Sequence, residues 1–314
     1  MTTSAARHGD APGRGGAHRA DEPAVRLVAS DLDGTLLRPD ATVSERTRAA
    51  IARTLAAGVE FVMVTGRPPR GVREIAARAG VGGLAICANG GLVYDLDAGA
   101  VVASTPLGTE AGRRLVRELR AAVPGTVFAS ETATGFLRGT GWLRPRVPEP
   151  DGAVPDDSSV DDPLALVAEP VVKLLVRNPE LPFAELAARV RAAAGDDAVV
   201  TWSGPELLEV SAAGVTKAFA LEWLCGRLGV EAREVVAIGD MQNDLTMLAW
   251  AGRSVAVANA AEEVLEAVDE VTAANVEDGV ALVLERLVAE VSPARRARPA
   301  SGAGRRGAGA APRR

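Results

Sequence analysis

The sequence predicts an α/β protein in which a parallel sheet is covered by helices on both faces and a smaller α+β unit is inserted into it. In the first and last parts of the chain, short and almost continuously apolar runs alternate with segments of helical period, which is typical of buried parallel strands joined by helices. The strand-like runs are 25–29, 59–64, 84–87, 235–238 and 254–257, and the helical segments are 44–57, 70–79 and 244–250. With 314 residues, 47% of them hydrophobic, the chain can build one large or two ordinary domains.

The middle of the chain has a different pattern and accounts for the inserted unit. Its helical segments are 108–122 and 182–194, and its strand-like runs are 126–129, 171–176, 198–202 and 207–210. A stretch rich in Pro and Asp, 145–162, is expected to be a loop, and the runs 92–94 and 101–103 predict a hairpin at the edge of the first part. The expected division is a disordered tail (1–23), the first part of the core (24–106), the inserted unit (107–210), the second part of the core (211–291) and a disordered basic tail (292–314).

Composition narrows the chemistry that this chain can perform. Both histidines, His8 and His18, lie in the expected N-terminal tail, which leaves the folded body without an imidazole for Ser-His-Asp catalysis or a zinc site. The two cysteines lack the spacing of a metal site. Acid–base chemistry therefore falls mainly to carboxylates. Only Lys173 and Lys217 are lysines among 35 basic residues, so a lysine within a motif is informative.

The chain shows no sign of a membrane or secretory destination. No apolar run is long enough to span a bilayer, and the polar N-terminus lacks the apolar centre of a secretory signal, so we expect a cytoplasmic protein. The expected C-terminal tail carries seven arginines and no acidic residue. Because no aromatic residues interleave with these charges, we expect neither a specific nucleic-acid partner nor a membrane partner. We expect a monomer or a weak homo-oligomer.

The most informative motif is the run Asp-Leu-Asp-Gly-Thr at 31–35, which directly follows the first apolar run. Two carboxylates so close together, Asp31 and Asp33, raise each other's pKa unless a cation offsets their charge. Gly34 then allows the chain to turn sharply. Such a pair at the end of a strand indicates a functional site more than a structural turn.

Three further polar motifs accompany this pair. Thr65-Gly66-Arg67 follows the strand ending at 64, Lys217 opens a helix, and a run from Asp240 to Asp244 follows the strand ending at 238. In an open parallel sheet the carboxyl ends of the strands form the ligand-binding edge, so the four acidic residues of these motifs are expected to crowd one crevice. Oxygen ligands without His or Cys suit Mg²⁺, and Lys217 with the Thr65 hydroxyl adds a positive charge and a donor. This mixture suits a phosphoryl group.

These motifs together resemble the haloacid dehalogenase (HAD) superfamily, and within it the Cof-type phosphatases with a large α/β cap of the C2 type. They read DLDGTLL (31–37), CANGGLVYD (87–95), VTGR (64–67), GVTKAFAL (214–221), GDMQNDLTML (239–248), VAVANA (255–260) and EDGVA (277–281). The resemblance covers roughly residues 24–290. It implies a Rossmann-like core with the inserted unit as a cap domain, and a hydrolase that uses Mg²⁺.

The resemblance also implies a role for each matching residue. Asp31 would be the nucleophile that forms an aspartyl-phosphate, and Asp33 the acid and base. The implied Mg²⁺ ligands are Asp31, the main-chain carbonyl of Asp33, Asp240 and Asp244, with the last acting directly or through water. The groups implied to hold the phosphoryl oxygens are the Leu32 amide, Thr65, Gly66, Lys217 and Asn243.

Several assignments stay open at this point. Arg67 suits a structural ion pair or a substrate contact equally, and Asn89 serves either a tight turn or the substrate. Lys173 is expected to be a solvent-facing strand residue. The first expectation for the substrate is a sugar phosphate, taken from the resemblance alone. The alternatives are a phosphomutase, a phosphatase of a flavin or another cofactor phosphate, and a non-catalytic regulatory protein on the same fold.

Overall fold

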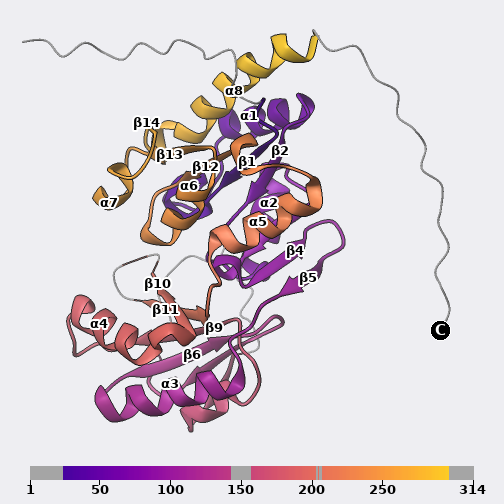
Figure 1. Ribbon diagram of the computed structural model, residues 1–314. Coiled ribbons are helices and arrows are strands. Elements are labelled where there is room, and N and C mark those ends of the chain that lie inside the picture. Colours follow the sequence, from indigo (N-terminus) through magenta and orange to yellow (C-terminus); the bar gives the residue numbers. More distant parts are fainter. Residues whose placement is uncertain (1–23, 143–156, 203, 205–206, 297–314) are drawn as a thin grey trace, which may run out of the picture.

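The computed structural model describes residues 24–142, 157–202, 204 and 207–296, and its core contains a five-stranded parallel sheet (Figure 1). The strand order is β14-β13-β12-β1-β2. These strands are β1 (Leu27–Ser30), β2 (Glu60–Met63), β12 (Val235–Gly239), β13 (Arg253–Val257) and β14 (Glu270–Thr272). β1 lies between β12 and β2, so that Ser30 pairs with Ile238 on one side and Met63 on the other. The residues that follow these three strands are thereby brought to one edge of the sheet.

Helices cover both faces of this sheet. One face carries α1 (Glu45–Ala56), α2 (Arg73–Ala79) and α8 (Gly279–Arg296), and the other carries α5 (Lys217–Leu228), α6 (Leu245–Trp250) and α7 (Glu262–Leu265). Side chains alternate between the two faces along a strand, and β1 is apolar on both. Val28 belongs to the apolar cluster of the first face, while Leu27 and Ala29 belong to that of the second. This explains the uninterrupted apolar run from which the strand was predicted.

A small antiparallel sheet extends the core beyond β2. It consists of β3 (Leu84–Cys87), β4 (Leu92–Asp95) and β5 (Ala100–Ser104), and the hairpin predicted from 92–94 and 101–103 is formed by β4 and β5. The strand at 84–87 was expected in the parallel sheet. It instead pairs along its length with β4, and only a bridge between Val64 and Ile86 links it to the end of β2.

The inserted unit is built on a six-stranded sheet of order β10-β11-β9-β6-β7-β8. Helices α3 (Thr109–Ala122) and α4 (Phe183–Ala194) pack on one face of it, on the side away from the core (Figure 1). Its strands are β6 (Val127–Glu131), β7 (Phe136–Gly139), β8 (Asp157–Val160), β9 (Lys173–Arg177), β10 (Ala198–Thr201) and β11 (Leu208–Ala212).

Two strands of this sheet were missed from the sequence. β7 was not predicted at all, and β8 lies within 145–162, which was expected to be a loop, so that expectation is wrong for its last part. β8 is the edge strand of the sheet and β7 lies between it and β6, and their sequences FLRG and DSSV lack the apolar alternation of a buried strand. Residues 145–156 of the expected loop lie outside the described part of the chain.

Alternation along the strands of the inserted unit places three charged side chains on the face turned toward the core. Leu174 and Val176 of β9 pack against the helices, whereas Lys173 of the same strand points toward the core. In β11, Leu208 and Val210 pack against the helices, and Glu209 between them points toward the core. Glu131 of β6 lies beside Lys173 in register. Lys173 is only 4% exposed, so the expectation that it faces solvent is wrong.

The ends of the chain lie largely outside the described residues. Residues 1–23 and 297–314, both expected to be disordered, are among those not described. Helix α8 runs to Arg296 and so enters the range 292–314 that was expected to be a tail. Within the described ranges, no helix has the length and apolar character needed to cross a membrane.

Candidate active site

The site begins where β1 ends. The main-chain amide of Asp31 donates to the carbonyl of Ile238 at 2.9 Å, which fixes Asp31 against the last part of β12. Residues 32–36 then form a tight turn in which Gly34 has φ +81°. A Cβ atom on Gly34 would lie 2.3 Å from Oδ2 of Asp240, so the glycine is required both by its conformation and by this close approach. The turn lets the Thr35 hydroxyl donate to Asp240 at 2.6 Å.

The loop after β12 supplies the second group of carboxylates. Oδ2 of Asp244 accepts hydrogen bonds from the main-chain amides of Asp240 and Met241, each at 3.0 Å. These bonds hold the loop closed and orient the other oxygen of Asp244 toward Lys217. Asp244 therefore shapes the loop and also takes part in the charged cluster.

Lys217 is the first residue of α5, and its side chain is completely buried. The helix is capped by Thr216, whose hydroxyl accepts from the amide of Phe219. Nζ of Lys217 lies 2.5 Å from Oδ1 of Asp31 and 2.5 Å from Oδ1 of Asp244. A single ammonium group thus joins the first acidic motif to the last one.

Asp31, Asp240 and Asp244 offer carboxylate oxygens that all lie within 4.8 Å of one another. Three buried negative charges face the one positive charge of Lys217, so a divalent cation with a preference for oxygen fits this donor set. The sequence prediction that these three residues meet is therefore supported by the geometry. The carboxylate of Asp33 is not part of the cluster.

Burial and the neighbouring negative charges together raise the pKa values of carboxylates in the cluster. Burial raises the pKa of Asp240 to about 7, and the nearby charge of Asp244 adds to this shift. Burial also raises the pKa of Asp31 well above its ordinary value, against the opposing effect of Lys217. Burial alone would lower the pKa of Lys217, but the carboxylates of Asp244 and Asp31 outweigh it and raise that pKa. Without a metal ion, the cluster thus favours bound protons.

The metal-free protein is expected to lose stability as the pH rises from about 5.5 to about 8. The folded state binds the Asp240 proton more tightly than the unfolded state, whose carboxyl has an ordinary pKa of 3.8, so the free energy of unfolding falls between these two pKa values. The change is on the order of a few kcal/mol. The melting temperature in a chelator should fall across this range, and Mg²⁺ should raise it more at about pH 8 than at about pH 5.5.

Carboxylates with lowered pKa values do not disturb this test, because their stabilising effect is lost only as the pH falls through still lower values; they are Asp40, Glu234, Asp278 and Glu285. Asp240→Asn should flatten the dependence on pH in the chelator. A melting temperature of the metal-free protein that rises from about pH 5.5 to about pH 8 would contradict the assignment.

Arg67 contacts Asp33 of the first acidic motif. Its Nε and Nη2 atoms donate to the two oxygens of Asp33, each at 2.7 Å, in the bidentate geometry typical of strong arginine–carboxylate pairs. The side chain of Asp33 is 48% exposed, while that of Arg67 is 13% exposed. Thr65 is fully buried, and its hydroxyl accepts from the amide of Arg67 at 3.0 Å. Arg67 thus orients the side chain for which the resemblance implies an acid–base role.

Asn89 and Asn243 meet on the other side of the site. Nδ2 of Asn243 donates to Oδ1 of Asn89 at 3.1 Å, and both residues are buried. Asn89 has φ +56°, a conformation that asparagine tolerates, and its Nδ2 donates to Glu209 of the inserted unit. Asn89 therefore has the tight-turn role that was left open for it, and its side chain also joins another predicted site residue to the inserted unit. The inserted unit also contacts the main chain of Gly66, whose carbonyl accepts a hydrogen bond from Nζ of Lys173.

Sequence reasoning missed two kinds of residue here. Thr35 belongs to the first motif but had no role assigned, although its hydroxyl contacts Asp240. Glu209 was not singled out, although a charged residue in the apolar run 207–210 is a usable signal of a polar contact on one face of the sheet. Leu32, for which the resemblance implies an amide contact, lies buried at the start of the turn after Asp31.

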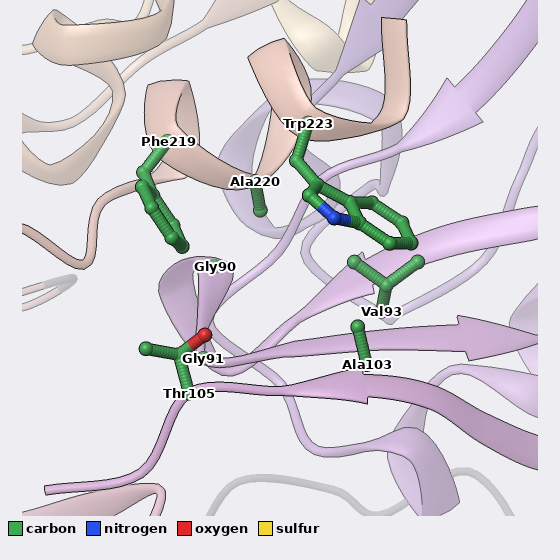
Figure 2. Close-up of a pocket in the computed structure, with 8 residues that line it drawn as sticks. All are labelled: Gly90, Gly91, Val93, Ala103, Thr105, Phe219, Ala220 and Trp223. Carbon is green, nitrogen blue, oxygen red and sulfur yellow. The ribbon is translucent and has the colours of Figure 1, made fainter. Parts of the chain in front are cut away.

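An apolar pocket lies elsewhere on the core, between α5 and the β4–β5 hairpin. Figure 2 shows Trp223 of α5 turned toward Val93 and Ala103 of the hairpin, and Phe219 of the same helix turned toward Gly90 and Thr105. Gly90, Gly91, Thr105 and Ala220 complete its lining. This lining contains no carboxylate or lysine, so the acidic cluster and not this pocket is the candidate active site.

The protein has a Rossmann-like core, an inserted cap domain and an acidic cluster at the carboxyl ends of the core strands. These features define a class of capped α/β proteins whose acidic cluster could hold a metal ion. The chain belongs to the haloacid dehalogenase-like hydrolases, whose family model matches residues 28–284. The predicted family and fold class are thereby confirmed.

Two relatives agree with this membership, and a solved structure shares the fold. The chain is 30% identical over 272 residues to the 5-amino-6-(5-phospho-D-ribitylamino)uracil phosphatase YcsE of Bacillus subtilis, covering 84% of this chain and 96% of the relative. It is 28% identical over 265 residues to the pyridoxal phosphate phosphatase YbhA of Escherichia coli, covering 82% and 96%. The crystal structure of SMU.1108c from Streptococcus mutans matches with a TM-score of 0.73 at 21% identity, covering 85% of this chain and 100% of that one, and shows the shared fold.

Proposed function

We propose that this protein is a Mg²⁺-dependent phosphohydrolase that cleaves small phosphorylated metabolites through an aspartyl-phosphate on Asp31. One observation carries the proposal. Asp31 stands at the end of β1, its carboxylate 2.5 Å from Nζ of Lys217 and grouped with the buried carboxylates of Asp240 and Asp244. A nucleophile that shares a cation site and contacts a buried ammonium group suits transfer of a phosphoryl group.

The proposed reaction has two steps. An oxygen of Asp31 attacks phosphorus, the bond from phosphorus to the ester oxygen breaks, and Asp33 gives a proton to the departing alcohol. A water molecule then attacks the same phosphorus, Asp33 takes a proton from that water, and the phosphate leaves as Asp31 is restored. The pair of hydrogen bonds from Arg67 orients the ionised carboxylate of Asp33, which is the form that takes the proton from water.

The charge on the transferring group is balanced from two sides. When bound by Asp31, Asp240, Asp244 and the main-chain carbonyl of Asp33, Mg²⁺ supplies positive charge that stabilises the phosphoryl oxygens. The donors proposed on the other side are the Leu32 amide, Thr65, Gly66, Lys217 and Asn243. Fixed donors of this kind in a buried site each contribute roughly 3 kcal/mol to the stabilisation of a transition state.

The organic part of the substrate is proposed to lie under the cap domain, whose sheet turns charged side chains toward the core. A sugar phosphate is our first candidate. The relatives named for a phosphoribitylamino uracil and for pyridoxal phosphate support a small organic monophosphate and also keep a cofactor phosphate as a candidate. A phosphomutase shares the aspartyl-phosphate step but returns the phosphoryl group to a sugar instead of to water.

Hydrolysis of p-nitrophenyl phosphate with and without Mg²⁺, followed by a panel of phosphorylated metabolites ranked by kcat/KM, tests the proposal. We expect release of inorganic phosphate that depends on Mg²⁺ and is highest for one chemical class of the panel. An isomerised sugar phosphate without free phosphate would favour the phosphomutase. A folded protein without turnover on any member would favour the non-catalytic alternative and contradict our proposal.

A further inference from the structure

The face of the cap sheet that is turned toward the core carries a buried ion pair, Lys173 on β9 and Glu209 on β11. Nζ of Lys173 lies 2.5 Å from Oε1 of Glu209, and each residue is 4% exposed. Removing two charges from water is unfavourable unless further hydrogen bonds satisfy them. Among the described residues, both side chains find these further bonds in the core and not within the cap.

Lys173 contacts a group proposed to surround the phosphoryl oxygens, and Glu209 reaches another such group, Asn243, through Asn89. Lys173 donates to the main-chain carbonyl of Gly66 at 2.7 Å, and Oε2 of Glu209 accepts from Nδ2 of Asn89 at 2.5 Å. A Cβ atom on Gly66 would lie 3.0 Å from Oδ1 of Asn89 and 3.7 Å from Oε2 of Glu209. The pair and Asn89 therefore lie directly against the Gly66 main chain.

Glu209 also fixes the orientation of the side-chain amides of Asn89 and Asn243, which are linked to it by consecutive hydrogen bonds. An ionised carboxylate only accepts hydrogen bonds, so Asn89 must turn its Nδ2 toward Glu209 and its Oδ1 toward Asn243. Asn243 must then present its own Nδ2 to Asn89. Its Oδ1 is buried and has no hydrogen-bond partner among the described residues. The charge on a cap residue thus determines how a core residue proposed to bind phosphate presents its amide.

We propose that Lys173 and Glu209 are positioning residues that couple the seating of the cap to phosphate affinity, through Gly66 on one side and through Asn89 and Asn243 on the other. This inference rests on the proposed function, because it takes Gly66 and Asn243 as phosphate-binding groups. Movement of the cap would remove both contacts together. The phosphate side of the site is then held in its present geometry only while the cap is seated.

Glu209→Gln tests the coupling with minimal change in shape. The ammonium of Lys173 requires an acceptor, so the new amide turns its oxygen toward Lys173 and its nitrogen toward Asn89. Asn89 and Asn243 must then both reverse or lose their hydrogen bonds. We expect inorganic phosphate, titrated calorimetrically in the presence of Mg²⁺, to bind about tenfold more weakly, with a matching rise in KM and a smaller change in kcat.

Glu131→Gln is the matched control. Glu131 lies on the same face of the cap sheet, is equally buried against the core, and joins cap to core through Arg70, which donates to its Oε2 at 2.7 Å. If ion pairing between cap and core were purely structural, both variants would lower the melting temperature and neither would change phosphate affinity. That result would overturn the inference, whereas an effect on phosphate binding confined to Glu209→Gln supports it.

Asn89→Gly is a second test of the coupling. Glycine keeps the left-handed backbone at this position but removes the amide that links Glu209 to Asn243. Asn89→Gly should weaken phosphate binding by a similar factor, and the double variant should be no weaker than either single variant. Fully additive effects would show that Glu209 does not act through Asn89. Wild-type protein that neither binds phosphate nor turns over would contradict the proposed function itself, while unchanged affinity in Glu209→Gln contradicts only the coupling.

Discussion

Asp31→Asn is expected to lower turnover of p-nitrophenyl phosphate by about 10⁴-fold or more, to the background of the assay. A carboxamide has nearly the shape of a carboxylate but is not a nucleophile that forms an acyl phosphate. The fold should persist, since the substituted side chain keeps the volume of the original one and Lys217 keeps its contact with Asp244. In the metal-free protein at about pH 8, the melting temperature of this variant should equal or exceed that of wild type, because one of three buried negative charges is gone.

An adduct with beryllium fluoride tests whether Asp31 is the nucleophile. Wild-type protein incubated with Mg²⁺ and beryllium fluoride should form a stable adduct on Asp31, and Asp31→Asn should form none. Asp33→Asn is the matched variant, since it also should reduce turnover strongly but should leave Mg²⁺ binding largely intact, as its proposed metal ligand is the main-chain carbonyl. Near-native turnover in Asp31→Asn would show that the nucleophile is assigned wrongly.

The position of Asp31 against Asp240 illustrates what the sequence predicted well. Each acidic residue follows an apolar strand, and the carboxyl ends of parallel strands share one edge of a sheet. The meeting of these residues therefore required only that both strands be parallel and near each other, and β1 and β12 are in fact adjacent. The distances within the cluster, and the central place of Lys217 in it, depend on how α5 docks and could not be read from spacing.

The Lys173–Glu209 pair illustrates what the sequence could not predict. In isolation each residue is one charge in an apolar strand, and a charge on a strand most often faces water. Its burial depends on the cap resting on the core, a contact between elements far apart in the chain. β7 and β8 were missed because their sequences FLRG and DSSV carry no apolar pattern of a strand, and their pairing with β6 and with each other depends on the rest of the sheet.

Lys217→Met is expected to have the largest effect on stability, about 3–5 kcal/mol in the metal-free protein at about pH 8. Methionine fills most of the lysine volume, but it leaves the buried carboxylates of Asp31 and Asp244 facing each other without the ammonium. Turnover should also fall strongly, because Lys217 is proposed to hold the phosphoryl group and to fix Asp31. Chemical denaturation in a chelator and in Mg²⁺ measures the loss, which should be smaller with the metal bound.

The dependence on pH identifies the cause of this loss. Lys217 lowers the pKa of Asp31 and of Asp240, so its removal raises both and allows protons to neutralise the cluster as the pH falls. The destabilisation by Lys217→Met should therefore shrink from about pH 8 to about pH 5.5. Thr216→Ala is the matched control at the start of the same helix. It removes the side-chain hydrogen bond that caps the N-terminus of α5, and it should lower the free energy of unfolding by about 1 kcal/mol at both pH values. If Lys217→Met were no more destabilising than Thr216→Ala, or equally destabilising at both pH values, the ammonium would not be the group that holds these carboxylates together.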